Sequence, residues 1–170
     1  MKISNSQQGF TMVELIITIA ILSFGVLAVY EVFYPIITYT HAINLKFTAT
    51  NLAQEGLEVA RNMRDNNFIA GTAWSGGLLD CQAGCQLDYT TDASVQADAS
   101  TLVAYDPNTF LRVNDDGLHG YGSGNATPFT REIVVNQVST DILKVTANVY
   151  WSYNGQPYSF SADQYLYNWY

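Results

Sequence analysis

The sequence of 170 residues has little positive charge and few residues that bind metals. Lys and Arg number 7 against 15 Asp and Glu, so the net charge of −8 makes a polyanion such as DNA a poor partner. The two histidines, His41 and His119, are isolated, and a zinc site would need further ligands. No nucleophile with a base and an orienting partner can be picked out, and no phosphate loop is present. We therefore expect neither enzymatic activity nor a cofactor.

The N-terminal region also lacks the features of a cleavable secretory signal. Only Lys2 and the α-amino group are positive before the first apolar run, and no small-x-small cleavage site follows Tyr30. From Phe10 to Tyr30 the only charged residue is Glu14. At about 1.5 Å per residue, a helix of this length spans a hydrocarbon core of roughly 30 Å. The sequence therefore predicts a retained membrane helix, residues 10–34, that carries a carboxylate near its start.

The charges on either side of this span predict its orientation. Lys2 favours a cytoplasmic N-terminus, and residues 80–116 hold seven acidic side chains against one arginine. Cys81 and Cys85, in the sequence CQAGC, lie in the same polar segment and suit an oxidising compartment. Their spacing allows a small disulfide or two free thiols, and a structural disulfide is the favoured interpretation. We expect a single-pass protein of the cytoplasmic membrane whose C-terminal domain is extracytoplasmic.

A long amphipathic pattern continues the apolar run. Residues 10–67 predict one helix, on the order of 85 Å long, in which Pro35 removes a backbone donor and predicts a kink. Ion pairs of Glu58 with Arg61, and of Arg61 with Asp65, are expected on its polar side. The apolar stripe of the second half, 35–67, has three- and four-residue spacing. It consists of Leu45, Ala49, Leu52, Ala53, Leu57, Ala60 and Met63.

The last part of the chain, residues 105–170, has the patterns of β-strands. Residues 142–153, ILKVTANVYWSY, alternate strictly between apolar and polar positions, and TREIVVNQV before them is rich in β-branched residues. The dipeptide Asn154-Gly155 predicts a hairpin with the next strand, within QPYSFSADQYLYNW. We expect an α+β fold in which the long helix packs its stripe on one face of an antiparallel sheet of about four strands.

Two further segments connect these elements. Residues 68–104 are rich in Gly, Ser, Thr, Ala and Asp with little periodicity, which predicts a long, partly ordered loop. The sequence NDDG, residues 114–117, predicts a turn between two short strands. Its acidic oxygens lack the spaced ligands and the distal glutamate of an EF-hand loop, so a plain turn is favoured over a calcium site.

The sequence GFTMVE, residues 9–14, resembles the processing motif of type IV prepilins and of the pseudopilins of type II secretion. In these families a membrane peptidase cuts after the glycine, and the new N-terminal residue is methylated. The resemblance implies that residues 1–9 are a short leader. It also implies cleavage between Gly9 and Phe10, N-methylation of Phe10, and a role for Glu14, the fifth mature residue, in assembly. The implied partners are the prepilin peptidase, the cytoplasmic membrane and other pilins or pseudopilins.

The physical chemistry of Glu14 supports that implication. A carboxylate near the centre of a membrane helix costs about 2.5 to 3.5 kcal/mol on insertion scales and less near an interface, so such a residue tends to have a partner or a function. Cleavage at Gly9 would create an α-amine that can pair with the Glu14 of a neighbouring subunit and fix axial register. The alternative is that Glu14 only snorkels at the cytoplasmic edge of an ordinary anchor.

Two functions follow from the sequence. NLAQEGLEVARNMRD, residues 51–65, is similar to a segment of the V-type minor pilins and I-type minor pseudopilins. The first function is that of a minor pilin or pseudopilin, a structural subunit of a cell-surface or periplasm-spanning filament. The alternative is an extracytoplasmic binding or adhesion domain held by a plain single-span anchor. A processed N-terminus separates the two, because a plain tether has no use for the removal of its first nine residues.

Overall fold

One long helix begins the described part of the chain. The computed structural model describes residues 9–91 and 102–169, so residues 1–8 of the predicted leader lie outside it. The helix α1 (Met12–Ala70) continues through Pro35, and the kink expected there stays a prediction. The chain forms two compact units, Met1–Ile43 and Asn44–Tyr170, so that α1 contributes its apolar part to one and its amphipathic part to the other.

The C-terminal end of α1 is closed by a Schellman motif. Gly71 has a φ of 69°, in the left-handed region that favours glycine. Its N–H donates to the carbonyl of Phe68 (3.1 Å), and the N–H of Thr72 donates to the carbonyl of Asn67 (3.0 Å). These two bonds satisfy carbonyls that the last turn would otherwise leave unpaired. The helix therefore ends at Ala70 because a glycine follows it, a local feature of the sequence.

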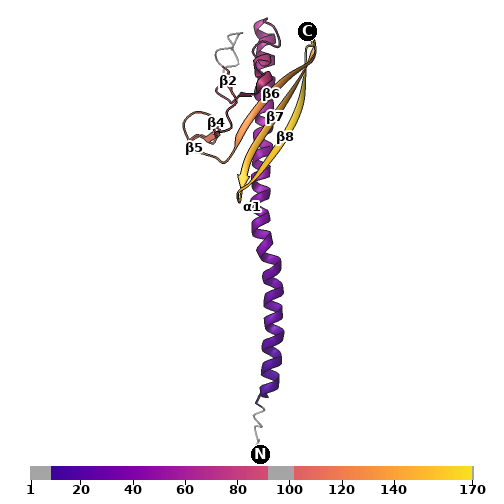
Figure 1. Ribbon diagram of the computed structural model, residues 1–170, viewed down its shortest axis with the longest axis vertical. Helices are drawn as coiled ribbons and strands as arrows, with labels where there is room; N and C mark the ends of the chain where they lie inside the picture. The colour runs from indigo at the N-terminus through magenta and orange to yellow at the C-terminus, as the bar shows by residue number, and fades with distance from the viewer. Residues whose placement is uncertain (1–8, 92–101, 170) are drawn as a thin grey trace, which may run out of the picture. The chain divides into compact units, whose positions relative to one another are not determined.

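Three long antiparallel strands form most of the main sheet. They are β6 (Thr130–Ser139), β7 (Ile142–Tyr153) and β8 (Gln156–Tyr167), and Figure 1 shows them side by side over the C-terminal part of α1. Asn154 and Gly155, with φ of 52° and 75°, make the two-residue turn between β7 and β8. The predicted hairpin is confirmed, because positive φ at both turn positions is what an Asn-Gly turn supplies.

Short strands extend this sheet and build a second one. In the main sheet the order is β2 (Val103–Ala104), β1 (Cys85–Gln86), β6, β7 and β8. A small sheet has the order β4 (His119–Gly120), β3 (Arg112–Val113) and β5 (Asn125–Ala126). The turn between β3 and β4 is the one predicted at NDDG. The sequence did not predict β1, nor the 3₁₀ helix η1 (Leu78–Ala83) that precedes it in the loop after α1.

The hydrophobic core lies between the amphipathic part of α1 and the main sheet. The predicted stripe is buried from Ala49 to Met63, and Leu45 is partly buried at its edge. On β7 the predicted alternation is confirmed, because Leu143, Val145, Ala147, Val149 and Trp151 are all buried. The long helix packed on an antiparallel sheet is therefore the α+β arrangement that the sequence predicts.

Close approach between α1 and β6 depends on Gly56. A Cβ added there would lie 2.6 Å from Cδ1 of Ile133 and 3.1 Å from Cδ of Arg131, both on β6. A Cβ essentially never lies as close as 2.6 Å to another carbon atom, so a larger side chain at position 56 would force the side chain of Ile133 to move within the packed core. The glycine, which weakens the helix locally by about 1 kcal/mol, is thus explained by packing.

Arg131 is completely buried and links three parts of the Asn44–Tyr170 unit. Its Nη1 donates to the carbonyl of Leu52 on α1 (2.9 Å) and lies 3.2 Å from Oε1 of Glu55, and its Nη2 donates to the carbonyl of Leu87 (2.6 Å). Its own carbonyl accepts from the hydroxyl of Tyr121 (2.8 Å). A buried guanidinium requires such partners, because an unpaired charge in the core is strongly destabilising. The side chain therefore fixes the loop after α1 to both helix and sheet.

A second buried polar group, Asp88, holds the same loop to the small sheet. Its Oδ2 accepts from the N–H of Tyr121 (2.8 Å), and its Oδ1 accepts from the N–H (2.9 Å) and hydroxyl (2.6 Å) of Thr90. Burial alone would raise the pKa of Asp88, but these bonds and the Arg131 guanidinium hold that pKa below its ordinary value. Burial raises the pKa of the Tyr121 hydroxyl to about 12.

The surface of the amphipathic helix carries one of the two predicted ion pairs. Nη1 of Arg61 lies 2.7 Å from Oε2 of Glu58, as expected for residues three positions apart. The expected pair of Arg61 with Asp65 is wrong. The carboxylate of Asp65 instead accepts from Nε and Nη2 of Arg64 at 2.8 and 2.6 Å. The guanidinium of Arg64 also lies over the ring of Trp169, 5.3 Å from its centroid, which is a favourable cation–π contact.

Candidate functional site

The segment that resembles a processing motif lies where α1 begins. Thr11 occupies the N-cap position, because the helix starts at Met12 and the carbonyl of Thr11 accepts from the N–H of Leu15 (3.1 Å). Its Oγ1 accepts from the N–H of Glu14 (3.3 Å), which satisfies one of the otherwise unpaired donors of the first turn. Thr11 and Glu14 have the Thr-x-x-Glu spacing of a capping box, which is a signal in the sequence for the start of a helix.

The hydroxyl groups farther along the apolar part of α1 are bonded to the helix itself. The hydroxyl of Thr18 donates to the carbonyls of Glu14 and Leu15, at 2.9 Å each. The hydroxyl of Ser23 donates to the carbonyl of Ile19 at 2.7 Å. Back-bonding of this kind lets Ser and Thr enter an apolar medium without leaving a donor unpaired. These two side chains therefore need no partner outside their own helix.

Glu14 differs from these hydroxyl groups. It lies in the first turn of α1 and is exposed, and its carboxylate makes no hydrogen bond or ion pair with any residue that the structure describes. The positive end of the helix dipole favours a carboxylate in the first turn, by about 0.3 to 1 kcal/mol for an exposed group. That is smaller than the cost of placing the charge in lipid, so the carboxylate keeps a strong tendency to pair.

Gly9 and Phe10 precede the helix and are free of tertiary contacts that would explain them. A Cβ added at Gly9 would meet nothing within 4 Å, and its φ lies outside the left-handed region. Phe10 is 82% exposed. The fold of this chain therefore gives no reason for glycine at position 9 or for phenylalanine at position 10.

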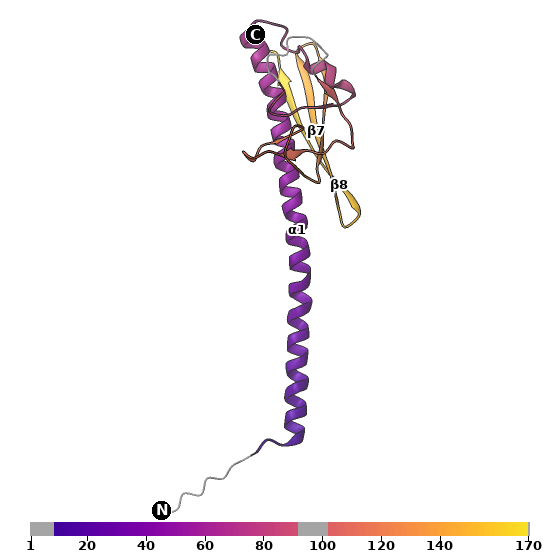
Figure 2. The same ribbon diagram turned by 90° about the vertical axis from the view of Figure 1, so that its left-hand side faces the viewer.

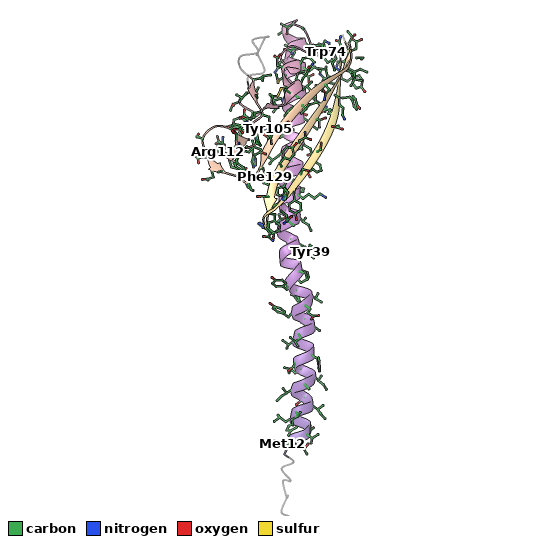
Figure 3. The ribbon with its side chains drawn as sticks, viewed as in Figure 1. Met12, Tyr39, Trp74, Tyr105, Arg112 and Phe129 are labelled. Carbon is green, nitrogen blue, oxygen red and sulfur yellow. A yellow bond between two sulfur atoms is a disulfide. The ribbon has the colours of Figure 1, made fainter. Side chains whose placement is uncertain are left out.

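The apolar half of α1 is exposed on all sides within its own unit. Figure 3 shows side chains that project in every direction between Met12 and Tyr39. The large apolar residues from Met12 to Phe33 are each more than half exposed, and the most apolar stretch of the helix has a mean hydropathy of 2.5. By length and composition the helix can cross a membrane. An all-round apolar surface of this kind is stable only in lipid or against other helices.

The two cysteines lie far from this segment in sequence and form a disulfide. The bond joins Cys81 in η1 to Cys85 in β1, with the Cα atoms 5.0 Å apart, so the favoured interpretation is confirmed. Both residues are buried in the core cluster. Because Gly84 between them has a φ of 93°, the chain can turn from η1 directly into β1, which pairs with Ile133 of β6. The disulfide thus has a structural position.

Metal-ligating side chains are not gathered anywhere in the described ranges, 9–91 and 102–169. No group of three or more His, Cys, Asp or Glu residues that could hold an ion is found there. His41 lies on α1 and His119 on β4. In the NDDG segment, Oδ1 of Asn114 accepts from the N–H groups of Asp116 and Leu118, which accounts for the segment as a turn.

Comparison with known proteins identifies a family motif at the start of the chain. The prokaryotic N-terminal methylation motif matches residues 4–30, which include Gly9, Phe10 and Glu14. Neither the curated proteins nor the solved structures gave a match. The matched residues include part of the predicted leader, 1–9, and most of the apolar segment, 10–34. The remaining chain has the expected arrangement, an amphipathic helix packed on an antiparallel sheet. The chain therefore combines a prepilin-type methylation motif with a pilin-like α+β arrangement, the two features expected of the type IV pilin and pseudopilin superfamily.

Proposed function

We propose that this protein is a minor pilin or pseudopilin, a subunit that a prepilin peptidase cuts between Gly9 and Phe10 and that then enters a filament. The observation that carries the proposal is the state of Glu14. The apolar part of α1 satisfies its hydroxyls at Thr18 and Ser23 internally, whereas the carboxylate of Glu14, in the first turn, is exposed and has no hydrogen-bond or ion-pair partner among the described residues. Such a group, in a helix whose whole surface is apolar, calls for a cationic partner from outside the chain.

The α-amine that cleavage would create at Phe10 fits that requirement. Phe10 is N-methylated in this proposal and stays basic, since methylation keeps the charge. Before assembly the subunit is held by the apolar helix in the inner membrane, with its N-terminus in the cytoplasm and its C-terminal unit outside. During assembly the amine of one subunit pairs with the Glu14 of its neighbour, so that both charges are neutralised and axial register is set.

The structural isolation of Gly9 allows a clean test of processing. Leucine at position 9 should block cleavage, because the residue before the scissile bond must be small, whereas alanine should be cut more slowly or normally. A Cβ at position 9 would meet nothing within 4 Å, and Gly9 lies before the start of α1, so a difference between the two variants is expected to report the peptidase and not the fold. The measurement is the mass of the N-terminal peptide from membranes and from sheared filaments. Filament material that still begins at Met1 would remove the proposal.

Assembly is tested separately at Glu14, with Glu31 as a matched control. Both are exposed acidic residues of α1. In this proposal only Glu14, which lies in the first turn, pairs with the amine of a neighbour. Glu14→Ala should leave the amount of membrane-inserted, processed protein unchanged or higher, and should lower the ratio of filament-bound to membrane-bound protein. Glu14→Asp should be intermediate, because the charge is kept and its reach is shortened. Glu31→Ala should match the wild type.

A plain membrane tether is the second candidate function, and it predicts no effect of Glu14→Ala on the ratio of filament-bound to membrane-bound protein. If Glu14 only snorkels, Glu14→Ala will have a normal filament-to-membrane ratio or the wild-type chain will be absent from filaments altogether. The matched motif, which extends over residues 4–30, favours the filament subunit.

A further inference from the structure

The last strand of the main sheet, β8, has an open edge. β8 ends the strand order of its sheet and is paired with β7 on one side only. It is 12 residues long, whereas the strand at the opposite end of the same sheet, β2, has only 2 residues. Figure 1 shows β8 as the outermost of the three long strands, and Figure 2 shows the β7–β8 hairpin from the side. Within the described part of the chain, no element pairs with the outer side of β8.

The register shows which backbone groups face outwards. Tyr153 and Gln156 flank the two-residue turn, so Gln156 directs its N–H and C=O towards β7. At the other end the N–H of Asn168 donates to the carbonyl of Asp141 (3.0 Å), in the same inward direction. The direction of the backbone N–H and C=O groups alternates along a strand, so the pairing at both ends of β8 indicates that the backbone groups of the even-numbered residues face β7. The outward backbone groups belong to Pro157, Ser159, Ser161, Asp163, Tyr165 and Tyr167.

Features that usually protect an edge strand from pairing are weak here. Proline occurs only at the second position, Pro157, and the single charged residue of β8 is Asp163. That charge is already neutralised, because Oδ2 of Asp163 lies 2.8 Å from Nζ of Lys144 and Oδ1 accepts from the hydroxyl of Thr146 (2.7 Å). Both partners lie on β7, so the pair is directed away from the open edge. An incoming strand would meet no unpaired charge.

Aromatic side chains border the same edge on both faces of the sheet. Tyr158 stacks on Trp151 with the ring centroids 5.8 Å apart and is still 46% exposed. On the opposite face Tyr165 and Tyr167 are 49% and 43% exposed. Partly exposed tyrosines are effective contact groups, because they give apolar area at a low entropic cost. They would cover the alternate side chains of a strand added to β8.

We propose that the outer edge of β8 is a strand-addition site that accepts an extended, uncharged segment of a different protein of the same assembly. The proposal rests on the proposed filament function. Antiparallel pairing with the β8 of a second copy of this chain fits less well, because a twofold axis between the two strands would point their helical segments 44–70 in opposite directions. Subunits of one filament all point the same way.

The test uses a proline that removes only an outward donor. Ser159→Pro deletes an N–H that faces away from β7 and leaves the β7–β8 ladder intact, whereas Ser159→Ala keeps that N–H. The hydroxyl of Ser159 makes no hydrogen bond with the described residues, so the two variants differ only at the backbone. Both are expressed as full-length chains, and the readout is the filament-to-membrane ratio. We expect Ser159→Pro to lower that ratio at least about fivefold, and Ser159→Ala to leave it unchanged.

Each outcome has a defined meaning. An equal ratio for Ser159→Pro and Ser159→Ala would overturn the proposal. If Ser159→Pro does not reach the membrane in a folded form, Ser159→Lys replaces it, since an exposed lysine blocks an edge without touching the backbone. With Cys81 and Cys85 joined to each other, Ser159→Cys adds the one free thiol. A disulfide-linked dimer of that variant would identify a second copy as the occupant and overturn the choice of a different protein. Absence of the wild-type chain from filaments would instead refute the proposed function.

Discussion

The buried guanidinium of Arg131 allows the contribution of one side chain to stability to be worked out. Arg131→Met keeps much of the length and the apolar volume but removes the charge and all donors. The carbonyls of Leu52 and Leu87 then lose donors at 2.9 and 2.6 Å, and Glu55 loses its counter-ion at 3.2 Å. Removing one partner of a buried ion pair costs about 3 to 5 kcal/mol. Oε1 of Glu55 is buried, but the side chain as a whole is 35% exposed and can turn its carboxylate towards water once the guanidinium is gone. The expected loss of stability is therefore near the lower limit, at about 3 kcal/mol.

The assay is thermal unfolding of the full-length chain in detergent micelles, followed by near-ultraviolet circular dichroism of the aromatic residues. At about 4 °C per kcal/mol for a domain of this size, Arg131→Met should lower Tm by about 12 °C. The matched control is Lys144→Met on β7, which breaks an ion pair whose side chains are 34% and 44% exposed. It should cost less than about 1 kcal/mol, because exposed pairs are well hydrated. Equal Tm values for the two variants would refute the role given to Arg131.

Three further predictions concern the Asn44–Tyr170 unit. Because the pKa of Asp88 is lowered in the fold, its contribution to stability is present above the unfolded pKa and is lost as pH falls through the folded pKa. Asp88→Asn should therefore make Tm fall less steeply below about pH 4 than in the wild type. An unchanged pH profile of Tm would contradict this. Gly56→Ala should lower the free energy of unfolding, measured by chemical denaturation, by about 1 to 2 kcal/mol, because crowding against β6 outweighs the gain in helix propensity. A variant more stable than the wild type would refute that contact. Residues 31–170 expressed alone should fold with Cys81 joined to Cys85. The double variant Cys81→Ser, Cys85→Ser should lower the free energy of unfolding by only about 2 kcal/mol, because the closed loop is short. Two thiols that react in the native, oxidised protein would contradict the disulfide.

Local patterns in the sequence determined a large part of this protein. The stripe from Ala49 to Met63 and the alternation of residues 142–153 predicted the faces that are buried, because periods of 3.6 and 2 residues each direct side chains to one side. The Asn-Gly turn at 154–155 and the motif at 9–14 depend on a few adjacent residues. Features of this kind need no knowledge of the rest of the chain.

Only the tertiary structure decided how distant segments meet. The alternation along β6 places Arg131 on the face that packs against the core, so the sequence can predict a buried charged residue there. Its hydrogen-bond partners lie 79 and 44 residues away in the sequence, and no local pattern identifies them. The same holds for β1, whose two residues become a strand because β6 lies beside them. Whether β8 has a neighbour on its outer side is likewise a property of the whole sheet. Hydrogen-bond partners and strand edges depend on the arrangement of the whole chain, so the local periodicity of the sequence does not predict them.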